Sequence, residues 1–317
     1  MSTPITAAQV KELRDRTGAG MSDCKKALEA TGGDLDAAAE KLRIEGMAKA
    51  DKKGARTAAE GMIALASDAG AVALVEINCE TDFVAKGEDF RGLGKAAAEA
   101  VLKQRPASVE ALLALKAGEQ TFDEKRRALV AKIGENITIR RFELVQAAGG
   151  PLVSYVHPGD KIAVALAMKQ GDAELARDLA MHIAAMSPRH VEASHVPADV
   201  LEAERKVNEA KVAKEQADAE AEAAEAGKPF KPKPAEILAK MVEGKLRKFV
   251  EEITLHGQAF VKNEAHGMKT DDSIEKLLKA KNAAVAGFVR LAVGEGIEKK
   301  KEDFAAEVAA QIGPKKD

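Results

Sequence analysis

The sequence predicts an α+β protein whose core contains two related units, each with an antiparallel sheet. Apolar runs on both sides of tight turns indicate β-hairpins at 62–78 and 152–168. A helical stretch follows each hairpin, and an apolar strand closes each unit, at 137–145 and 285–293. We interpret this shared order of hairpin, helix and returning strand as an internal repeat.

Ahead of these units, three short helices are expected to form a compact N-terminal module that ends near residue 45. Thr6 is placed to cap the first helix, Ser22 the second and Asp34 the third. The stretch 17–21 separates the first two helices. So short a module buries only a small core, so we expect it to lean on the rest of the protein. A charged linker is expected to follow at 48–60.

The first unit is expected to hold three helices between its hairpin and its closing strand, at 88–103, 109–115 and 122–133. In the second unit one helix, 173–186, follows the hairpin directly. The closing strand then appears only after a long insertion. The second copy is therefore predicted to be interrupted rather than incomplete.

The insertion itself predicts an antiparallel coiled-coil arm. Residues 198–226 are almost all Ala, Glu, Lys, Asp, Val and Arg without Gly or Pro, a composition that favours a long exposed helix. A Pro-rich turn at 227–234 precedes a return helix with apolar residues spaced by three and four. After the second unit, a short amphipathic helix is expected at 303–312.

Composition and charge exclude several classes of function. The 317 residues include 49 Lys and Arg against 51 Asp and Glu, so the chain is not a general binder of polyanions. Aromatic residues make up only 3%, which argues against sugar-stacking grooves and single-strand nucleic-acid platforms. Two cysteines are too few for a disulfide framework and indicate a reducing cytoplasm. No signal-like stretch is recognised, and the longest uncharged run, 144–159, contains Gly and Pro and does not predict a spanning helix.

No motif predicts nucleotide hydrolysis or a metal site. Residues 92–95 lack the earlier glycine and the following Ser or Thr of a phosphate-binding loop. Neither cysteine has a partner at zinc-ligand spacing. A nucleophilic Cys79 paired with His157 or His182 is a separate hypothesis. The strand alternation that places Cys79 two residues after Ile77 favours a small buried side chain instead.

Two exposed turns have alternative interpretations. Lys228, Lys231 and Lys233 at the tip of the arm could contact phosphate, but a Pro-rich turn needs solvated residues in any case, and we favour that simpler explanation. His157 precedes Pro158 in the second hairpin turn. It is either an exposed partner contact or an ordinary polar turn residue, and the residues alone leave both interpretations open.

The most informative segment is 81–84, where the chain must turn from a strand into a helix. Asp82 is suited to cap or steady such a turn. Phe83 would ordinarily belong to the core. Because Phe90 and Leu93 already give the following helix an inward face, we interpret Phe83 as an aromatic held on a rigid loop and available to anchor a partner.

Five segments of the chain resemble the elongation factor Ts family of bacteria in its long form. The first two are long and specific to that family, and together the matches extend over essentially the whole sequence. They are residues 17–28 (TGAGMSDCKKAL), 75–86 (VEINCETDFVAK), 131–137 (AKIGENI), 240–244 (KMVEG) and 293–298 (VGEGIE).

The resemblance implies a division of the chain that agrees with the elements predicted above. The implied parts are a three-helix ubiquitin-associated-like domain at 1–50, a linker at 51–60, a first core subdomain at 61–147, a second core subdomain at 148–196 and 254–297, an inserted coiled-coil arm at 197–253, and a C-terminal module at 298–317. The Pro-rich arm loop is longer than the family leads us to expect.

The resemblance also implies a function: guanine-nucleotide exchange on elongation factor Tu during protein synthesis. In the family, the loop that corresponds to residues 81–84 intrudes near the nucleotide site of the GTPase and helps to dislodge Mg²⁺. That role carries over to Thr81, Asp82, Phe83 and Val84. Further implied partner contacts are Arg14, Gly20, Met21, His157 and Phe304. The resemblance implies no catalytic residue, no cofactor and no metal of its own, and neither a nucleic acid nor a membrane as partner.

Two other classes of function make different predictions. A nucleic-acid-binding module that uses the arm tip would bind polyanions with strong salt dependence. A cysteine enzyme would lose turnover on Cys79→Ala. The balanced charge argues against the first class and the strand alternation against the second.

Overall fold

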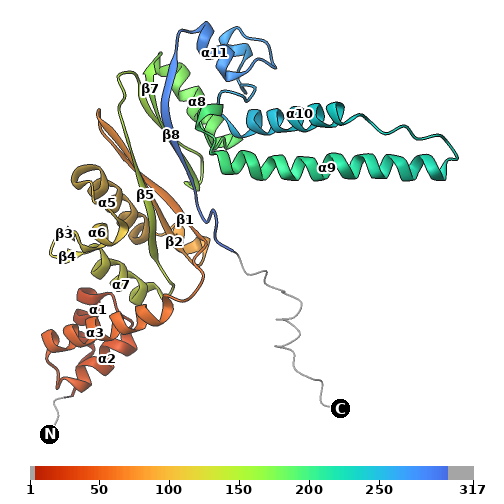
Figure 1. Ribbon diagram of the computed structural model, residues 1–317. Coiled ribbons are helices and arrows are strands. Elements are labelled where there is room, and N and C mark those ends of the chain that lie inside the picture. Colours follow the sequence, from red (N-terminus) through yellow and green to blue (C-terminus); the bar gives the residue numbers. More distant parts are fainter. Residues whose placement is uncertain (1–3, 299–317) are drawn as a thin grey trace, which may run out of the picture.

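The computed structural model describes residues 4–298 and combines helices with antiparallel sheets (Figure 1). The helices are α1 (Ala7–Thr17), α2 (Met21–Ala30), α3 (Leu35–Lys53), α4 (Asp82–Ala85), α5 (Glu88–Gln104), α6 (Val109–Ala114), α7 (Phe122–Ile133), α8 (Ala173–Met186), α9 (Ala198–Glu225), α10 (Ala235–Ile253) and α11 (Ile274–Ala280). The strands are β1 (Glu60–Ser67), β2 (Ala71–Cys79), β3 (Lys116–Ala117), β4 (Gln120–Thr121), β5 (Thr138–Gln146), β6 (Leu152–Val156), β7 (Ile162–Gln170) and β8 (Ala284–Ala292). Within this part of the chain, every helix is too short or too polar to span a lipid bilayer.

The N-terminal helices begin largely where the sequence predicts. The Thr6 hydroxyl accepts a hydrogen bond from the first turn of α1, and the Asp34 carboxylate accepts two from the first turn of α3. The prediction that Ser22 caps the second helix was wrong. The carbonyl of Gly20 already accepts the first helical hydrogen bond, from Cys24, so Gly20 is the cap and Ser22 lies inside α2.

The third helix is longer than expected and occupies part of the predicted linker. It continues to Lys53, so only residues 54–59 connect it to β1. Two lysines in its last turn suit the negative end of the helix dipole, and Gly46 lets the helix approach Ala131 of α7 closely. Ion pairs such as Arg127–Asp51, at 3.2 Å, join the two helices. The small module therefore leans on the core, as its size predicts.

The first sheet has the order β1-β2-β5, and all its pairs are antiparallel. The central strand β2 is buried along its full length. Its odd-numbered side chains, such as Val75 and Ile77, pack with Phe90 of α5 and Val130 of α7 in one core. The predicted hairpin, helices and returning strand of this unit are all present, together with the unpredicted short hairpin β3–β4 and helix α4.

The second sheet has the order β6-β7-β8 and the same antiparallel pairing. Its central strand β7 packs through Val164 and Leu166 against Leu179 of α8 and Leu277 of α11. Helix α11 was not predicted. The hairpin, the helix and the delayed returning strand lie where the sequence pattern places them.

The two sheets also pack against each other through an apolar layer. The even-numbered residues Val72 and Leu74 of β2 meet Ala163 and Ala165 of β7, with Leu291 of β8 alongside. Each central strand is therefore buried on both faces: one face meets helices and the other meets the opposite sheet.

The insertion between α8 and β8 forms two antiparallel helices that project from the second unit (Figure 1). Val212 of α9 and Val242 and Leu246 of α10 are buried between them, and Lys245 pairs with Glu215 at 2.8 Å. The expected C-terminal helix at 303–312 lies outside the described residues.

Candidate functional site

The 81–84 loop lies at the end of the buried central strand of the first sheet. Strand β2 ends at Cys79, the one-turn helix α4 follows at Asp82–Ala85, and α5 begins at Glu88. A strand that is buried on both faces is a rigid support. The loop is therefore held firmly at its base, while its outer side chains face solvent.

Thr81 fixes the start of α4 from both sides. Its hydroxyl oxygen accepts a hydrogen bond from the Val84 N–H at 3.5 Å and donates its proton to Glu135 Oε1 at 2.6 Å. The other oxygen of Glu135 accepts hydrogen bonds from the N–H groups of Glu80 and Thr81, at 3.1 and 3.0 Å. One carboxylate thus orders the loop, a role that sequence reasoning did not assign to Glu135.

A second contact ties the same base to the connection after α3. Glu80 Oε1 accepts a hydrogen bond from the Asn136 N–H at 2.6 Å. The buried Asn136 side chain donates to the carbonyls of Gly54 and Arg56, at 3.4 and 2.7 Å. The sequence signal for this arrangement is the run 134–136, in which Gly134 ends α7 in the left-handed conformation and turns the two polar residues toward the loop.

Asp82 does not cap the helix, contrary to one expectation. Thr81 occupies that position, so Asp82 falls in the first turn of α4 and pairs instead with Lys86 at 2.7 Å. The hydrogen bond from Lys86 lowers the pKa of the Asp82 carboxyl, with the nearby positive charge of Lys161 contributing. Asp82 therefore carries its negative charge at neutral pH, on the exposed side of the loop.

Phe83 is the most exposed large apolar side chain among the described residues. It is 81% accessible to solvent, whereas the following Val84 packs against the first core and Ala85 is buried. Lys86 Nζ lies 5.9 Å from the centre of the Phe83 ring. The sequence interpretation that this Phe is not a core residue is confirmed. An isolated aromatic on a rigid base is a suitable anchor for a protein partner.

The structure argues against a nucleophilic Cys79. Burial raises the pKa of its thiol to about 12, with the negative charge of Glu135 adding to the effect, and its Sγ donates to the Thr81 carbonyl. Of the two histidines considered as its base, His182 is buried in the second unit against Gln258, and His157 contacts Tyr155. Cys79 instead supports the loop from below as a core side chain.

His157 is exposed in the β6–β7 turn, and this turn is tied to the first unit. The Asp160 carboxylate pairs with Arg91 of α5 at 2.7 Å, while its carbonyl accepts a hydrogen bond from the N–H of Ile63 in β1. Lys161 pairs with Glu60 at 2.7 Å. The turn therefore belongs to the same end of the molecule as the 81–84 loop.

The predicted N-terminal contacts lie on a neighbouring surface. Arg14 is in the last turn of α1, and Gly20 and Met21, which is 47% exposed, begin α2. Lys132 of α7 lies beside the 17–21 stretch and binds Asp89, in the first turn of α5, at 2.7 Å. Gly20 and Lys132 both line a groove of about 330 Å³ between the N-terminal module and α7.

The remaining candidates do not join the loop. The arm-tip lysines Lys228, Lys231 and Lys233 are exposed in the loop that joins α9 to α10. Phe304 lies outside the described residues. Among residues 4–298, no group of His, Cys, Asp or Glu side chains is arranged to hold a metal ion.

Comparison with known proteins gives one consistent result. A family model described as Elongation factor TS matches residues 80–295. The chain is 50% identical over 309 residues to Elongation factor Ts of Thioalkalivibrio sulfidiphilus, which covers 97% of this chain and 98% of that protein. It is 50% identical over 310 residues to the Xanthomonas campestris pv. campestris protein of the same name, covering 98% and 99%. Elongation factor Ts of Xanthomonas oryzae pv. oryzae is 49% identical over the same length.

Proposed function

The chain belongs to the elongation factor Ts family, and from this premise we propose that it is a cytoplasmic guanine-nucleotide exchange factor for elongation factor Tu. It binds the GDP-bound GTPase, promotes the release of GDP, and leaves when GTP binds. It performs no covalent chemistry, because its effect is to stabilise the nucleotide-free GTPase. By linkage, a nucleotide bound to the GTPase must weaken the grip of the factor to the same degree.

The observation that carries this proposal is the exposed Phe83 on its fixed base. The loop enters the partner near its nucleotide site, with Phe83 as the apolar anchor and Asp82 as the charged neighbour. Thr81 and Val84 hold the two ends of α4 in place. Displacement of the Mg²⁺ that the GTPase holds with its nucleotide is the step that this intrusion promotes.

One aromatic cannot supply the whole effect. Speeding nucleotide release by ~10⁴ needs about 5.5 kcal/mol of differential binding, whereas burying one Phe side chain gives roughly 1.5–3 kcal/mol. A broad interface that fits only the distorted GTPase must supply the remainder. The exposed turn at His157 and the N-terminal surface around Arg14, Gly20 and Met21 are our candidates for it.

We divide the chain into contact modules accordingly. The N-terminal helices are a ubiquitin-associated-like domain that extends to Lys53, with 54–59 as its connection to the core. Two core subdomains follow, and the second carries α9 and α10 as an inserted coiled-coil arm. Separate modules suit a factor that must hold several distant points of its partner.

The direct test is the release of fluorescently labelled GDP from purified elongation factor Tu, with and without this protein. We expect a large, saturable acceleration, and we expect Phe83→Ala to remove most of it. The Cys79→Ala variant should stay active, whereas a cysteine enzyme would lose its activity on this substitution. No acceleration by the folded wild-type protein would contradict the proposal.

A further inference from the structure

A buried carboxylate lies where the two sheets meet, and the function just described does not use it. Glu76 of β2 is completely shielded from solvent. Neighbouring β2 residues on the same face, Val72 and Leu74, belong to the apolar layer between the sheets. A charge in such a place must be fully hydrogen-bonded, or it would cost several kcal/mol.

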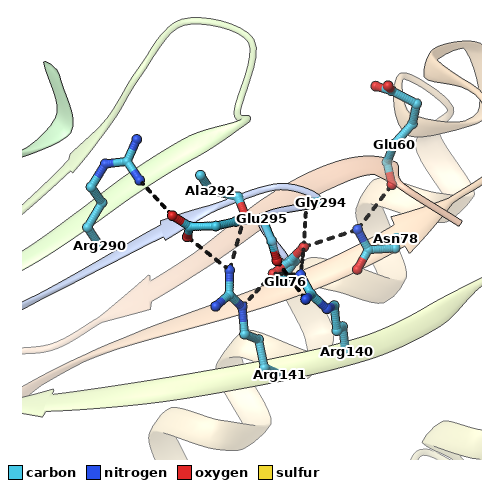
Figure 2. A network of polar contacts seen from close by, with 9 residues as sticks. All are labelled: Glu60, Glu76, Asn78, Arg140, Arg141, Arg290, Ala292, Gly294 and Glu295. Atoms are coloured by element: carbon cyan, nitrogen blue, oxygen red, sulfur yellow. Dashed lines mark hydrogen bonds and ion pairs between the residues drawn. The ribbon is translucent and has the colours of Figure 1, made fainter. Parts of the chain in front are cut away.

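The partners of Glu76 come from two directions (Figure 2). From β5 of its own sheet, Arg141 Nε donates at 2.6 Å and Arg140 Nη1 at 3.1 Å. From the other unit, the N–H of Gly294, just beyond β8, donates to Oε1 at 2.8 Å. Burial by itself would raise the pKa of Glu76, but the hydrogen bonds from Gly294, Arg141 and Asn78 outweigh it and lower the pKa.

The two arginines continue the connection into the second unit. Arg140 Nη2 donates to the Glu295 carbonyl at 2.6 Å. Arg141 Nη2 donates to the Ala292 carbonyl at 3.2 Å. Gly294 has a left-handed φ of +73°, and a Cβ there would lie 2.5 Å from the Ala59 carbonyl oxygen. The segment 292–295 therefore fits against the first unit only with glycine at this position.

A β-bulge makes this arrangement possible. The pairing of β2 with β5 shifts between Glu76 and Ile77, so that Glu76 pairs with Arg141 and Ile77 with Ile139. Ile139 and Phe142 both pack in the first core, and the two arginines between them reach the opposite face together. Regular alternation would have sent one arginine to each face.

The second unit shows that the fold itself does not need this network. Strand β7 has nine residues like β2, and its pairing with β8 shifts after the same sixth position, with a further shift between Met168 and Gln170. That sixth residue is Ala167, and its partner is Gly287. The same bulged strand is thus built in the second unit with small apolar residues. Since buried ion pairs are weak sources of stability, the network in the first unit calls for another role.

We propose that Glu76, Arg140, Arg141 and the segment 292–295 form a registry clamp that fixes the second unit against the first. An apolar layer between two sheets is non-directional and tolerates sliding, whereas directed hydrogen bonds allow one register. The clamp lies five residues before Thr81, and β8 pairs at this end with Ile162, next to the turn that carries His157. It holds the 81–84 loop and that turn at the separation needed to contact the GTPase together, a role that rests on the proposed exchange function.

The variant for the test is Arg140→Met, which removes the link to the Glu295 carbonyl but leaves Glu76 paired with Arg141 and Gly294. Its matched control is Arg126→Met. Arg126 is also a partly buried arginine of the first unit, and its bonds within residues 4–298 are to Asp123 and the Ile137 carbonyl of the same unit. Glu76→Gln is a second, stronger variant.

The first measurement is structural and needs no partner. Spin labels on Lys103→Cys in α5 and Lys279→Cys in α11 report the distance between the units, while the native cysteines are buried. We expect one narrow distance distribution for the wild type and for Arg126→Met. Arg140→Met should broaden or shift it. An unchanged distribution in a folded Arg140→Met protein would overturn the clamp.

The second measurement is the GDP release rate at saturating factor, normalised to the folded fraction. We expect about a tenfold loss for Arg140→Met and none for Arg126→Met, because misplaced contacts lower the rate per bound complex. A simple folding defect would lower only the active fraction. A broadened distance with a normal rate would overturn the link to exchange. If the wild type does not accelerate release, the proposed function fails, and the distance measurement still decides the clamp.

Discussion

The two core units follow one plan but differ where the central strand meets the next helix. In the second unit, only Gly171 and Asp172 separate β7 from α8, and the Asp172 side chain caps the helix by accepting the Leu175 N–H at 2.8 Å. In the first unit, residues 80–87 make the same connection and include α4 and the exposed Phe83. Two residues are enough for the fold, so the longer connection is free to serve the partner contact that we propose for it.

The largest effect is expected when the first connection is made like the second. Replacing residues 80–87 with Gly-Asp should leave the first sheet and α5 folded, because the second unit shows that this link suffices. Some stability should be lost with the buried Ala85. GDP release from elongation factor Tu should fall to the rate without factor. Circular dichroism and release kinetics check both statements, and a folded variant that still accelerates release would contradict our assignment of the loop.

The exposed Phe83 and the buried Phe90 allow a contact residue to be compared with a core residue. Phe83→Ala should remove a partner anchor, costing about 2–4 kcal/mol in transition-state stabilisation, or roughly a 30- to 900-fold slower catalysed release. Its melting temperature should not change, because the side chain is exposed. The matched variant is Phe90→Ala, seven residues on and completely buried in the core. It should lose about 3–5 kcal/mol of stability.

The two variants should therefore separate function from folding. Thermal melting of each protein alone, paired with stopped-flow release of labelled GDP, gives the comparison. If Phe83→Ala melts several degrees lower while exchange per folded molecule stays normal, then Phe83 is a structural residue. The same result would weaken the proposed role of the whole loop.

Local sequence patterns were enough to predict most of the elements of the fold. Alternating apolar runs located both hairpins, and the crowded inward face of α5, with Phe90 and Leu93 already in place, indicated that Phe83 is spare. The sequence predicts too early an end for α3, because the charged residues that end the helix resemble a linker. Helix propensity and contact with α7 keep these residues helical. The contact with α7 is a tertiary effect, so a local sequence pattern does not reveal it.

The parts of the site that were missed depend on distant partners. Glu135 orders the loop from 54 residues away, and no spacing rule joins it to Thr81. The clamp depends on a β-bulge, which shifts Arg140 to the face of Glu76 against the simple alternation of a strand. Asp82 was expected as a cap because its residue type suits that position, but Thr81 precedes it and meets the same need first.

The Glu135 carboxylate tests whether loop order matters beyond the Phe itself. Glu135→Ala removes the acceptor of three hydrogen bonds from Glu80 and Thr81. Hydrogen bonds to charged groups are worth about 1.5–3 kcal/mol. Because Cys79 still supports the loop from below, part of the loop order is retained, and we expect about a 5- to 30-fold slower release. Stopped-flow release is the measurement, and hydrogen exchange at residues 80–86 is its control. Faster exchange of these amides with an unchanged release rate would show that the loop needs no fixed conformation.

Glu76 stands where the second unit has Ala167, and its charge predicts that the stability of the first unit depends on pH. The pKa of Glu76 is lowered in the folded protein from its ordinary value of 4.5, so its contribution to stability is full above that value. This contribution is lost as the pH falls through the lowered pKa. Urea midpoints of the wild type and Glu76→Gln should differ most at neutral pH and converge as acid is added. A difference that is independent of pH would mean that the charge of Glu76 does not hold the network together.

Asp82 should give the smallest effect, because its ion pair with Lys86 is exposed. Its partner Lys86 lies one helical turn away at 2.7 Å, and such surface pairs contribute little to stability. Asp82→Asn should therefore leave the melting temperature unchanged and slow GDP release only about threefold, through the lost charge and the freed Lys86. The double variant Asp82→Asn with Phe83→Ala decides whether the two residues act as a unit. If their effects on the release rate multiply, Asp82 contacts the partner independently; if the double variant is no slower than Phe83→Ala alone, Asp82 acts by orienting the ring.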